Sequence, residues 1–188
     1  MKITTILGSP RINGNTASIL KLFEQHAILL GHSIDRINVV RYKLKGCTGC
    51  DKCKKIMDAP GCVLKDDMLA LFDRMIAADV IIYASPLYCW GYTAQIKPLI
   101  DRQYCLVKNY GTPQYKSFLQ DKHMALLVTA GDIIKDNADL IPLAFQRECD
   151  YTGSIAVGKY IVPLCTTPDA LGDKAEMTAD QMIHDLLG

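Results

Sequence analysis

The sequence predicts a doubly wound α/β domain in which a five-stranded parallel sheet of order 2-1-3-4-5 carries helices on both faces. Three observations predict this fold. Apolar runs alternate with helical patterns along the chain. The runs are nearly continuously apolar, as in strands that are buried on both faces. The chain has 188 residues, which suits one well-packed domain and is short for two. We therefore expect a single domain over residues 1–188.

The first half of the chain supplies two strands and two helices. Residues 2–8 form the first strand, and a polar loop separates it from a helix over residues 15–31. Residues 33–40 suit the second strand, and a cysteine-rich loop follows. The next helix is then expected to start at Asp66 or Asp67, because aspartate is a favourable N-cap.

The second half continues the alternation with three strands and three helices. We expect them, in turn, at residues 79–84, 92–106, 123–130, 137–149, 155–164 and 175–187. In a sheet of this order, ligands bind outside the carboxyl ends of the strands, at the point where the strand order reverses. The loops that follow strands 1, 3 and 4 are therefore the candidate binding loops.

Composition narrows the classes of partner. A formal net charge of +1 gives no overall attraction to nucleic acid, to a membrane surface or to acidic substrates. The chain opens with no charged and apolar leader, and no apolar run is long enough to span a bilayer. These features predict a soluble cytoplasmic protein. Its eight cysteines are then expected to have redox or metal roles, or to be buried, rather than to form disulfides.

The loop "GSPRINGNT" follows the first strand and leads into the first helix. Hydroxyl, amide and guanidinium groups gather there at a helix N-terminus, where unpaired N–H groups and the helix dipole favour an anion. The loop is therefore a candidate phosphate site, although Asn15 could serve only as a helix cap. The glycine spacings of nucleotide triphosphatases and of dinucleotide-binding folds are both absent.

The other two loops suit a flat ring. The stretch "SPLYCWGYTAQIK" offers aromatic and apolar walls, and the stretch "TAGD" after strand 4 allows close approach. No cysteine is followed by an arginine six positions later, as a phosphatase loop requires, and strands 1 and 3 end without the carboxylates of a receiver domain. Flavin mononucleotide (FMN) is the habitual ligand that remains.

Three motifs, "GSPRINGNT", "ASPLYCWGYTAQIKPLIDR" and "GCTGCDKCKK...GCVLKDDM", resemble the NADPH-dependent FMN reductase and iron-sulfur flavoprotein family of flavodoxin-like proteins. The resemblance implies that FMN binds, that NAD(P)H donates electrons, and that the flavin rather than a side chain carries the chemistry. It implies that the phosphate is held by Ser9, Arg11, Asn13, Asn15 and Thr16. It implies that the ring system contacts Pro86, Leu87, Tyr88, Trp90, Gly91, Thr129, Ala130, Gly131 and Asp132.

Four cysteines form a C-x2-C-x2-C-x8-C pattern in a lysine-rich loop. Three thiolates at this pitch, with a fourth from a separate segment, can bind an iron-sulfur cluster. The spacing therefore favours a four-iron four-sulfur cluster on Cys47, Cys50, Cys53 and Cys62. A reversible dithiol, structural zinc and simple burial stay open. Relatives that bind a cluster usually hold the fourth cysteine closer to the third. Burial is the expected role of Cys105, Cys149 and Cys165.

These features predict an FMN-dependent oxidoreductase that passes electrons from NAD(P)H or a reduced carrier to a flavin, a quinone or a protein. An electron carrier that relays single electrons through FMN and a cluster is the alternative, and a flavin and thiol redox sensor is a weaker one. A ferredoxin-type carrier is a possible partner; nucleic acid and membrane are not. The resemblance implies a homodimer or homotetramer, with Trp90, Tyr92 and residues 107–118 as candidate contacts.

Overall fold

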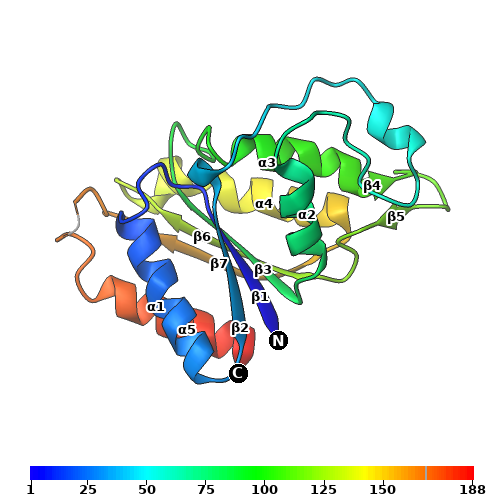
Figure 1. Ribbon diagram of the computed structural model, residues 1–188. Coiled ribbons are helices and arrows are strands. Elements are labelled where there is room, and N and C mark those ends of the chain that lie inside the picture. The colour runs from blue at the N-terminus through cyan, green and yellow to red at the C-terminus, as the bar shows by residue number, and fades with distance from the viewer. Residues whose placement is uncertain (168) are drawn as a thin grey trace.

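The computed structural model describes residues 1–167 and 169–188, and its centre is the predicted parallel sheet (Figure 1). The strand order is β2-β1-β3-β6-β7, which corresponds to 2-1-3-4-5 when the five sheet strands are counted along the chain. The fold is therefore the expected flavodoxin-like one. Its strands are β1 (Lys2–Leu7), β2 (Ser33–Asn38), β3 (Val80–Pro86), β6 (His123–Thr129) and β7 (Ile155–Val162).

Helices cover both faces of the sheet. On one face α1 (Asn15–Leu29) lies beside α5 (Lys174–Leu187), and on the other lie α2 (Met68–Ile76), α3 (Lys97–Arg102) and α4 (Ile141–Thr152) (Figure 1). Because every crossover between parallel strands needs a connection over one face, five strands in this order place helices on both sides.

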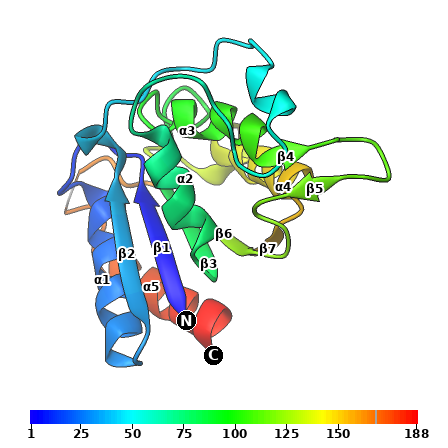
Figure 2. The same cartoon turned by 45° about the vertical axis from the view of Figure 1, so that its right-hand side comes forward.

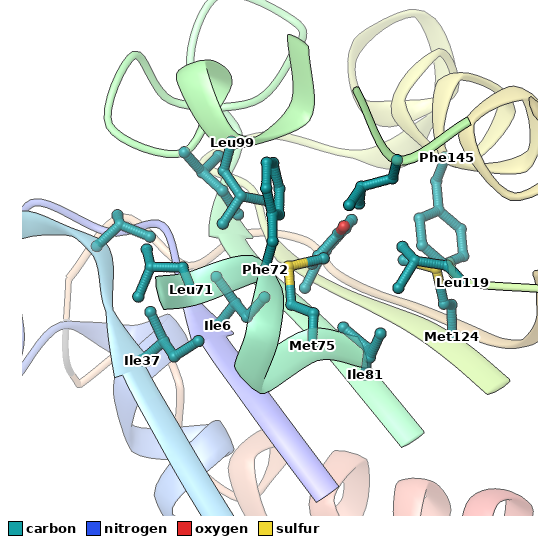
Figure 3. Packing of buried hydrophobic residues seen from close by; sticks show 14 of the residues in the cluster. Ile6, Ile37, Leu71, Phe72, Met75, Ile81, Leu99, Leu119, Met124 and Phe145 are labelled. Atoms are coloured by element: carbon teal, nitrogen blue, oxygen red, sulfur yellow. The ribbon is translucent and has the colours of Figure 1, made fainter. Parts of the chain in front are cut away.

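The core consists of two apolar layers, one on each side of the sheet. All seven residues of β3 are buried, so its side chains alternate between the layers. Ile81 faces the layer under α2, α3 and α4, together with Ile6, Phe72 and Phe145 (Figure 3). The opposite layer joins β3 to α1 and α5. This two-sided burial explains why the strands are almost continuously apolar.

The structure differs from the expected elements around α3. A helix was expected over residues 92–106, but α3 begins only at Lys97, with Pro98 in its first turn, and a 3-10 turn, η3 (Gln103–Leu106), follows it. Proline is favourable at the start of a helix and unfavourable inside one. The short hairpin of β4 (Val107–Lys108) and β5 (Lys116–Ser117) was not expected.

Other elements begin or end a few residues away from the positions predicted from the sequence. The helix expected over residues 137–149 is α4, which starts at Ile141 with a proline in its first turn and follows a π-type turn, η4 (Ile134–Ala138). Short 3-10 turns, η1 (Val39–Arg41) and η2 (Lys52–Lys55), lie before and within the cysteine-rich loop. No helix in residues 1–167 and 169–188 combines the length and apolarity needed to cross a bilayer.

Candidate functional site

The binding loops meet at one pocket, which lies at the carboxyl edge of the sheet. Its volume is about 640 Å³, within the usual range for cofactor sites. Ten of the predicted residues line it: Ser9, Arg11, Asn13, Asn15, Thr16, Pro86, Leu87, Tyr88, Thr129 and Gly131. The loops that follow β1, β3 and β6 therefore come together as the topology predicts.

Four predicted residues, Trp90, Gly91, Ala130 and Asp132, do not line this pocket. Five other residues do: Pro10, Ile12, Gly14, Cys165 and Thr166. Cys165, which was expected to be buried, is half-buried and sits in the loop after β7. Applying the strand-end rule to the fifth strand as well as the first, third and fourth would have found it.

The loop between β1 and α1 rests directly on the segment before α3. The Thr93 hydroxyl donates to the Gly8 carbonyl oxygen at 2.5 Å. A Cβ atom at Gly8 would lie 2.9 Å from the Cβ of Ile96, closer than two carbon atoms can approach. Ser9 then turns the loop, since its hydroxyl accepts from the backbone N–H of Arg11 at 3.1 Å. Glycine at position 8 therefore permits the close approach that fixes the loop.

The N-terminus of α1 carries no side-chain cap. Gly14 is the N-cap residue, and Asn15 was wrongly considered as a cap. The Asn15 amide instead donates to the carbonyl oxygens of Cys165 at 3.0 Å and Thr167 at 2.9 Å, and so ties the loop to the segment after β7. The first turn of α1 contains no acidic residue. Its free N–H groups are therefore available to an anion in the pocket.

Hydrogen bonds between loops hold the floor of the pocket. The hydroxyls of Thr16 and Thr129 lie 2.7 Å apart and are buried. The backbone N–H of Leu87 donates to the Thr129 carbonyl oxygen at 2.8 Å. The three loops are thus joined to one another, and this should keep the pocket in shape without a ligand.

A strained hairpin turn follows β3. Tyr88 and Gly91 exchange two backbone hydrogen bonds of 3.1 Å, and the residues between them, Cys89 and Trp90, have φ of +46° and +61°. Side chains other than glycine are disfavoured in this left-handed region. The turn presents the Trp90 indole to solvent, with 62% of the residue exposed.

The pocket fits the phosphate and ring of FMN. It contains a guanidinium, from Arg11, and none of its lining residues is acidic. The uncapped start of a 15-residue helix opens into it. Pro86, Leu87 and Tyr88 supply apolar and aromatic surface beside the polar loop. An anionic group with an attached flat ring matches this division into a polar and an apolar part.

The four motif cysteines lie together in a second pocket. Cys47, Cys50, Cys53 and Cys62 all line it, together with Arg102, Thr48, Gly49, Asp51, Val63, Leu64, Tyr104 and Cys105. The loop that carries them arches over α3 and meets the β4–β5 hairpin (Figure 2). Cys53 is buried, whereas Cys47 and Cys50 are exposed. Residues that are 15 positions apart in the sequence are thus brought to one place.

Two buried cations lie at or beside this pocket: Arg102 lines it, and Lys108 contacts the backbone of Cys53. The Lys108 side chain is fully buried, and its ammonium donates to the carbonyl oxygens of Cys53 at 2.9 Å and Pro60 at 3.0 Å. No carboxylate in the described part of the chain lies within 4.0 Å of it. Burial lowers the pKa of Lys108, because its charge is removed from water. A buried charge without a counter-charge is expensive, so the site favours a negative occupant.

The thiols differ in their environment. Hydrogen bonds from the Lys52 backbone and the Thr48 side chain lower the pKa of Cys50, while burial raises the pKa of Cys53. Burial also raises the pKa of Cys105 and of Cys149 to about 12. Cys105 and Cys149 are buried, as the sequence predicted.

The spacing of the sulfur atoms does not suit zinc. Four thiolates around one zinc ion, each at about 2.3 Å, would lie about 3.8 Å from one another. Within residues 1–167 and 169–188, no three of the cysteine Sγ atoms lie within 4.8 Å of each other. A four-iron cluster binds each thiolate to a different iron and needs a wider spacing.

The chain is similar to known flavoproteins and reductases. Residues 1–143 match the family described as NADPH-dependent FMN reductase. An iron-sulfur flavoprotein of Archaeoglobus fulgidus is 30% identical over 182 residues, which cover 97% of this chain and 77% of that protein. An iron-sulfur flavoprotein of Methanosarcina thermophila is 38% identical over 106 residues, which cover 56% of this chain and 54% of that protein. The chain thus spans about half the length of several curated relatives that it matches.

A solved structure shares the fold. The NAD(P)H:quinone oxidoreductase from Methanothermobacter marburgensis superposes with a TM-score of 0.74 at 13% identity, over 99% of this chain and 98% of that one. At this identity the likeness concerns the fold alone, and it agrees with the strand order and helix layers described above. The family match over residues 1–143 carries the assignment further: the chain belongs to the NADPH-dependent FMN reductase family.

Proposed function

We propose that the protein is an FMN-dependent oxidoreductase that takes electrons from NAD(P)H or a reduced carrier and passes them to a flavin, a quinone or a protein. The observation that carries the proposal is the pocket of about 640 Å³ at the carboxyl edge of the sheet, into which the uncapped start of α1 opens. Bound FMN would supply the electron-transfer chemistry, and the chain supplies binding and orientation.

Different residues of the pocket would bind the phosphate and the ring of FMN. Arg11, Asn13 and the first N–H groups of α1 would hold the phosphate, since they offer a positive charge and donors on one side of the pocket. Pro86, Leu87 and Tyr88 would contact the ring and exclude water from one of its faces. Two hydrogen bonds connect these two parts of the pocket: one between the Thr16 and Thr129 hydroxyls, and one from the Leu87 backbone N–H to the Thr129 carbonyl oxygen. No acid–base side chain is required for hydride transfer to the flavin.

An FMN titration followed by fluorescence tests the binding site. Arg11→Met removes a charge from the pocket and is expected to weaken FMN binding about 10- to 100-fold, because a charge-assisted hydrogen bond contributes about 1.5–3 kcal/mol. The matched control is Arg147→Met, which removes an exposed arginine on α4. Equal affinities of both variants and the wild type would place the phosphate elsewhere.

Steady-state oxidation of NADH and of NADPH tests the reaction. With FMN bound and a flavin or quinone added, rapid turnover of either donor is expected. Negligible turnover with both, but fast reduction by a ferredoxin-type donor, would favour the electron-carrier alternative. Protein that stays colourless after FMN is added would contradict the whole proposal.

A second candidate function adds a four-iron four-sulfur cluster on Cys47, Cys50, Cys53 and Cys62, so that the protein relays single electrons between FMN and a partner. Two observations favour it: the four cysteines share one pocket, and beside that pocket lies the buried Lys108, which contacts Cys53 and makes no ion pair with a described carboxylate. Iron and sulfide analysis of protein purified without oxygen tests it. About four irons per chain are expected, and Cys62→Ser should lose iron while retaining FMN.

Partners and assembly extend the proposal. Exposed lysines near the cysteine pocket, Lys43, Lys45, Lys52 and Lys55, would suit an acidic carrier protein such as a ferredoxin. Eight cysteines without a disulfide suit the reducing conditions of the cytoplasm. Exposed aromatic side chains, among them Trp90 and Tyr110, suit a contact between copies in a dimer or tetramer. Light scattering at several concentrations would measure the assembly.

A further inference from the structure

Arg102, the last residue of α3, forms part of the wall of the cysteine pocket. Only 1% of its side chain is exposed. Its Nη1 donates to the Asp66 carboxylate at 2.5 Å, and its Nη2 donates to the Cys62 sulfur at 3.3 Å. Nη1 also donates to the Lys45 carbonyl oxygen at 3.1 Å. The guanidinium therefore links α3, the segment before α2 and the fourth cysteine of the motif.

Asp66 is held in place by the same contacts. Burial opposes its ionisation, but the hydrogen bond from Arg102 and the backbone N–H groups of Lys45 and Met68 outweigh burial and lower its pKa. Asp66 is therefore a carboxylate that fixes one edge of the guanidinium and leaves the other edge to the sulfur. A planar fork of donors is rigid once both edges are bound.

One donor of this guanidinium has no partner. Arg102 Nε is buried and has no acceptor within the described residues. Since a buried donor is normally satisfied, this orphan points to an occupant of the pocket that accepts hydrogen bonds. Lys108, which is fully buried and contacts the Cys53 carbonyl oxygen, makes no ion pair with a carboxylate of the described residues. Two buried cations face one buried carboxylate, Asp66, since Asp51, the carboxylate that lines the pocket, is exposed to solvent; the buried groups therefore carry an excess of positive charge that favours an anionic occupant.

We propose that Arg102 is a positioning residue for the iron-sulfur cluster: it holds Cys62 in the ligand set, and its charge and hydrogen bond raise the reduction potential of the cluster. The inference rests on the cluster proposed above. Reduction adds one electron, supplied in the test by dithionite, and makes or breaks no bond. Hydrogen bonds to the sulfurs help to set the potential, and a buried charge is weakly screened.

The main test compares two double variants. Arg102→Met with Asp66→Asn removes both charges together, so that neither remains buried and unpaired. The control, Arg74→Met with Asp35→Asn, removes a partly buried pair of the same kind, with a 2.5 Å contact, that touches none of the four cysteines. Each protein is loaded with FMN, ferrous iron and sulfide without oxygen. The cluster is titrated by electron paramagnetic resonance and the flavin by absorbance.

We expect the reduced-to-oxidised ratio of the cluster at a given potential to fall about tenfold in the Arg102 double variant, which is a potential lower by about 59 mV for one electron. The flavin potential in the same sample and the cluster potential of the control should not change. Arg102→Lys keeps the charge but lacks the fork that reaches both Cys62 and Asp66, so its shift should be smaller.

The other outcomes are distinct. Equal cluster potentials in both double variants, with iron bound, would overturn the inference and leave the cluster standing. Wild-type protein that binds no iron would overturn both. Loss of iron from the Arg102 double variant alone, with FMN retained, would support the positioning role. The reduction potential of the cluster would then be measured in Arg102→Lys instead. An unchanged potential and iron content in Arg102→Lys would in that case overturn the effect on the potential.

Discussion

At the scale of single residues, Glu148, which lies outside both binding pockets, is expected to make the stability of the fold depend on pH. Glu148 lies on α4 and accepts a hydrogen bond from Tyr92 at 3.2 Å. Burial raises the pKa of Glu148 to about 8. In the unfolded chain its pKa is about 4.3. Between these values the native state holds a proton that the unfolded state has released, so the free energy of unfolding falls as the pH rises.

Glu148→Gln should therefore flatten the pH dependence of stability. The wild type is expected to lose at most about 5 kcal/mol of unfolding free energy between pH 4.5 and 8 through this group, and the variant should lose less. Urea denaturation at several pH values measures the difference. Glu176→Gln, at an exposed position on α5, is the control. A variant with the wild-type slope would show that Glu148 is ionised in the folded protein.

Gly8 is the second residue with a strong expected effect. An added Cβ would lie 2.9 Å from Ile96, so Gly8→Ala must displace the loop or the segment before α3. We expect a loss of about 1–3 kcal/mol of unfolding free energy, as in other overpacked sites, and weaker FMN binding. Gly46→Ala is the matched control, because no atom lies within 4 Å of the added carbon. Equal stabilities of the two variants would contradict the contact.

At the scale of elements, the turn after β3 holds Cys89 and Trp90 at positive φ, and Trp90 is predicted to contact the flavin ring. Replacing Cys89 and Trp90 by Asn and Gly supplies the residues that this type of turn prefers, and should stabilise the fold by about 1 kcal/mol. FMN binding should weaken if the indole covers the ring. Thermal unfolding and an FMN titration measure the two effects separately. A stabilised variant with wild-type FMN affinity would remove Trp90 from the flavin site.

Some elements could be predicted from the sequence and others could not. The five strands could be predicted because each is apolar on both faces, and that pattern is local. The β4–β5 hairpin could not, since each strand has two residues and is held by contacts such as that of Lys108 with Cys53. Asn15 was considered as a helix cap because its true acceptors, Cys165 and Thr167, are about 150 residues away in the chain. Distant partners leave no local pattern.

At the scale of the whole molecule, we expect FMN binding and folding to be independent of the cysteine side chains in the second pocket. Cys47 and Cys50 are exposed and Cys62 is half-buried, so these thiols contribute little to the core. The triple variant Cys47→Ser, Cys50→Ser and Cys62→Ser should bind FMN as the wild type does and unfold within about 4 °C of it, a shift that corresponds to less than about 1 kcal/mol. Absorbance and calorimetry test this. Loss of FMN would show that the flavin pocket depends on the cysteine loop.

The topology predicted the position of the flavin pocket but not the charges around the cysteines. The strand order alone places the loops after β1, β3 and β6 at one edge. Nothing in the sequence marks Arg102 or Lys108 as buried, and only the fold shows that they are. Lysine and arginine are so rarely buried that sequence reasoning assigns them to the surface.

The helix α3 follows the aromatic loop of one pocket and ends at Arg102 in the wall of the other. Six residues of helix extend about 9 Å and do not stretch. With FMN and a cluster bound as proposed, the helix would therefore fix the distance between the two redox centres. Electron tunnelling slows steeply with separation, so a fixed spacing would give every copy of the protein the same internal transfer rate. A flexible connection would give a spread of rates instead.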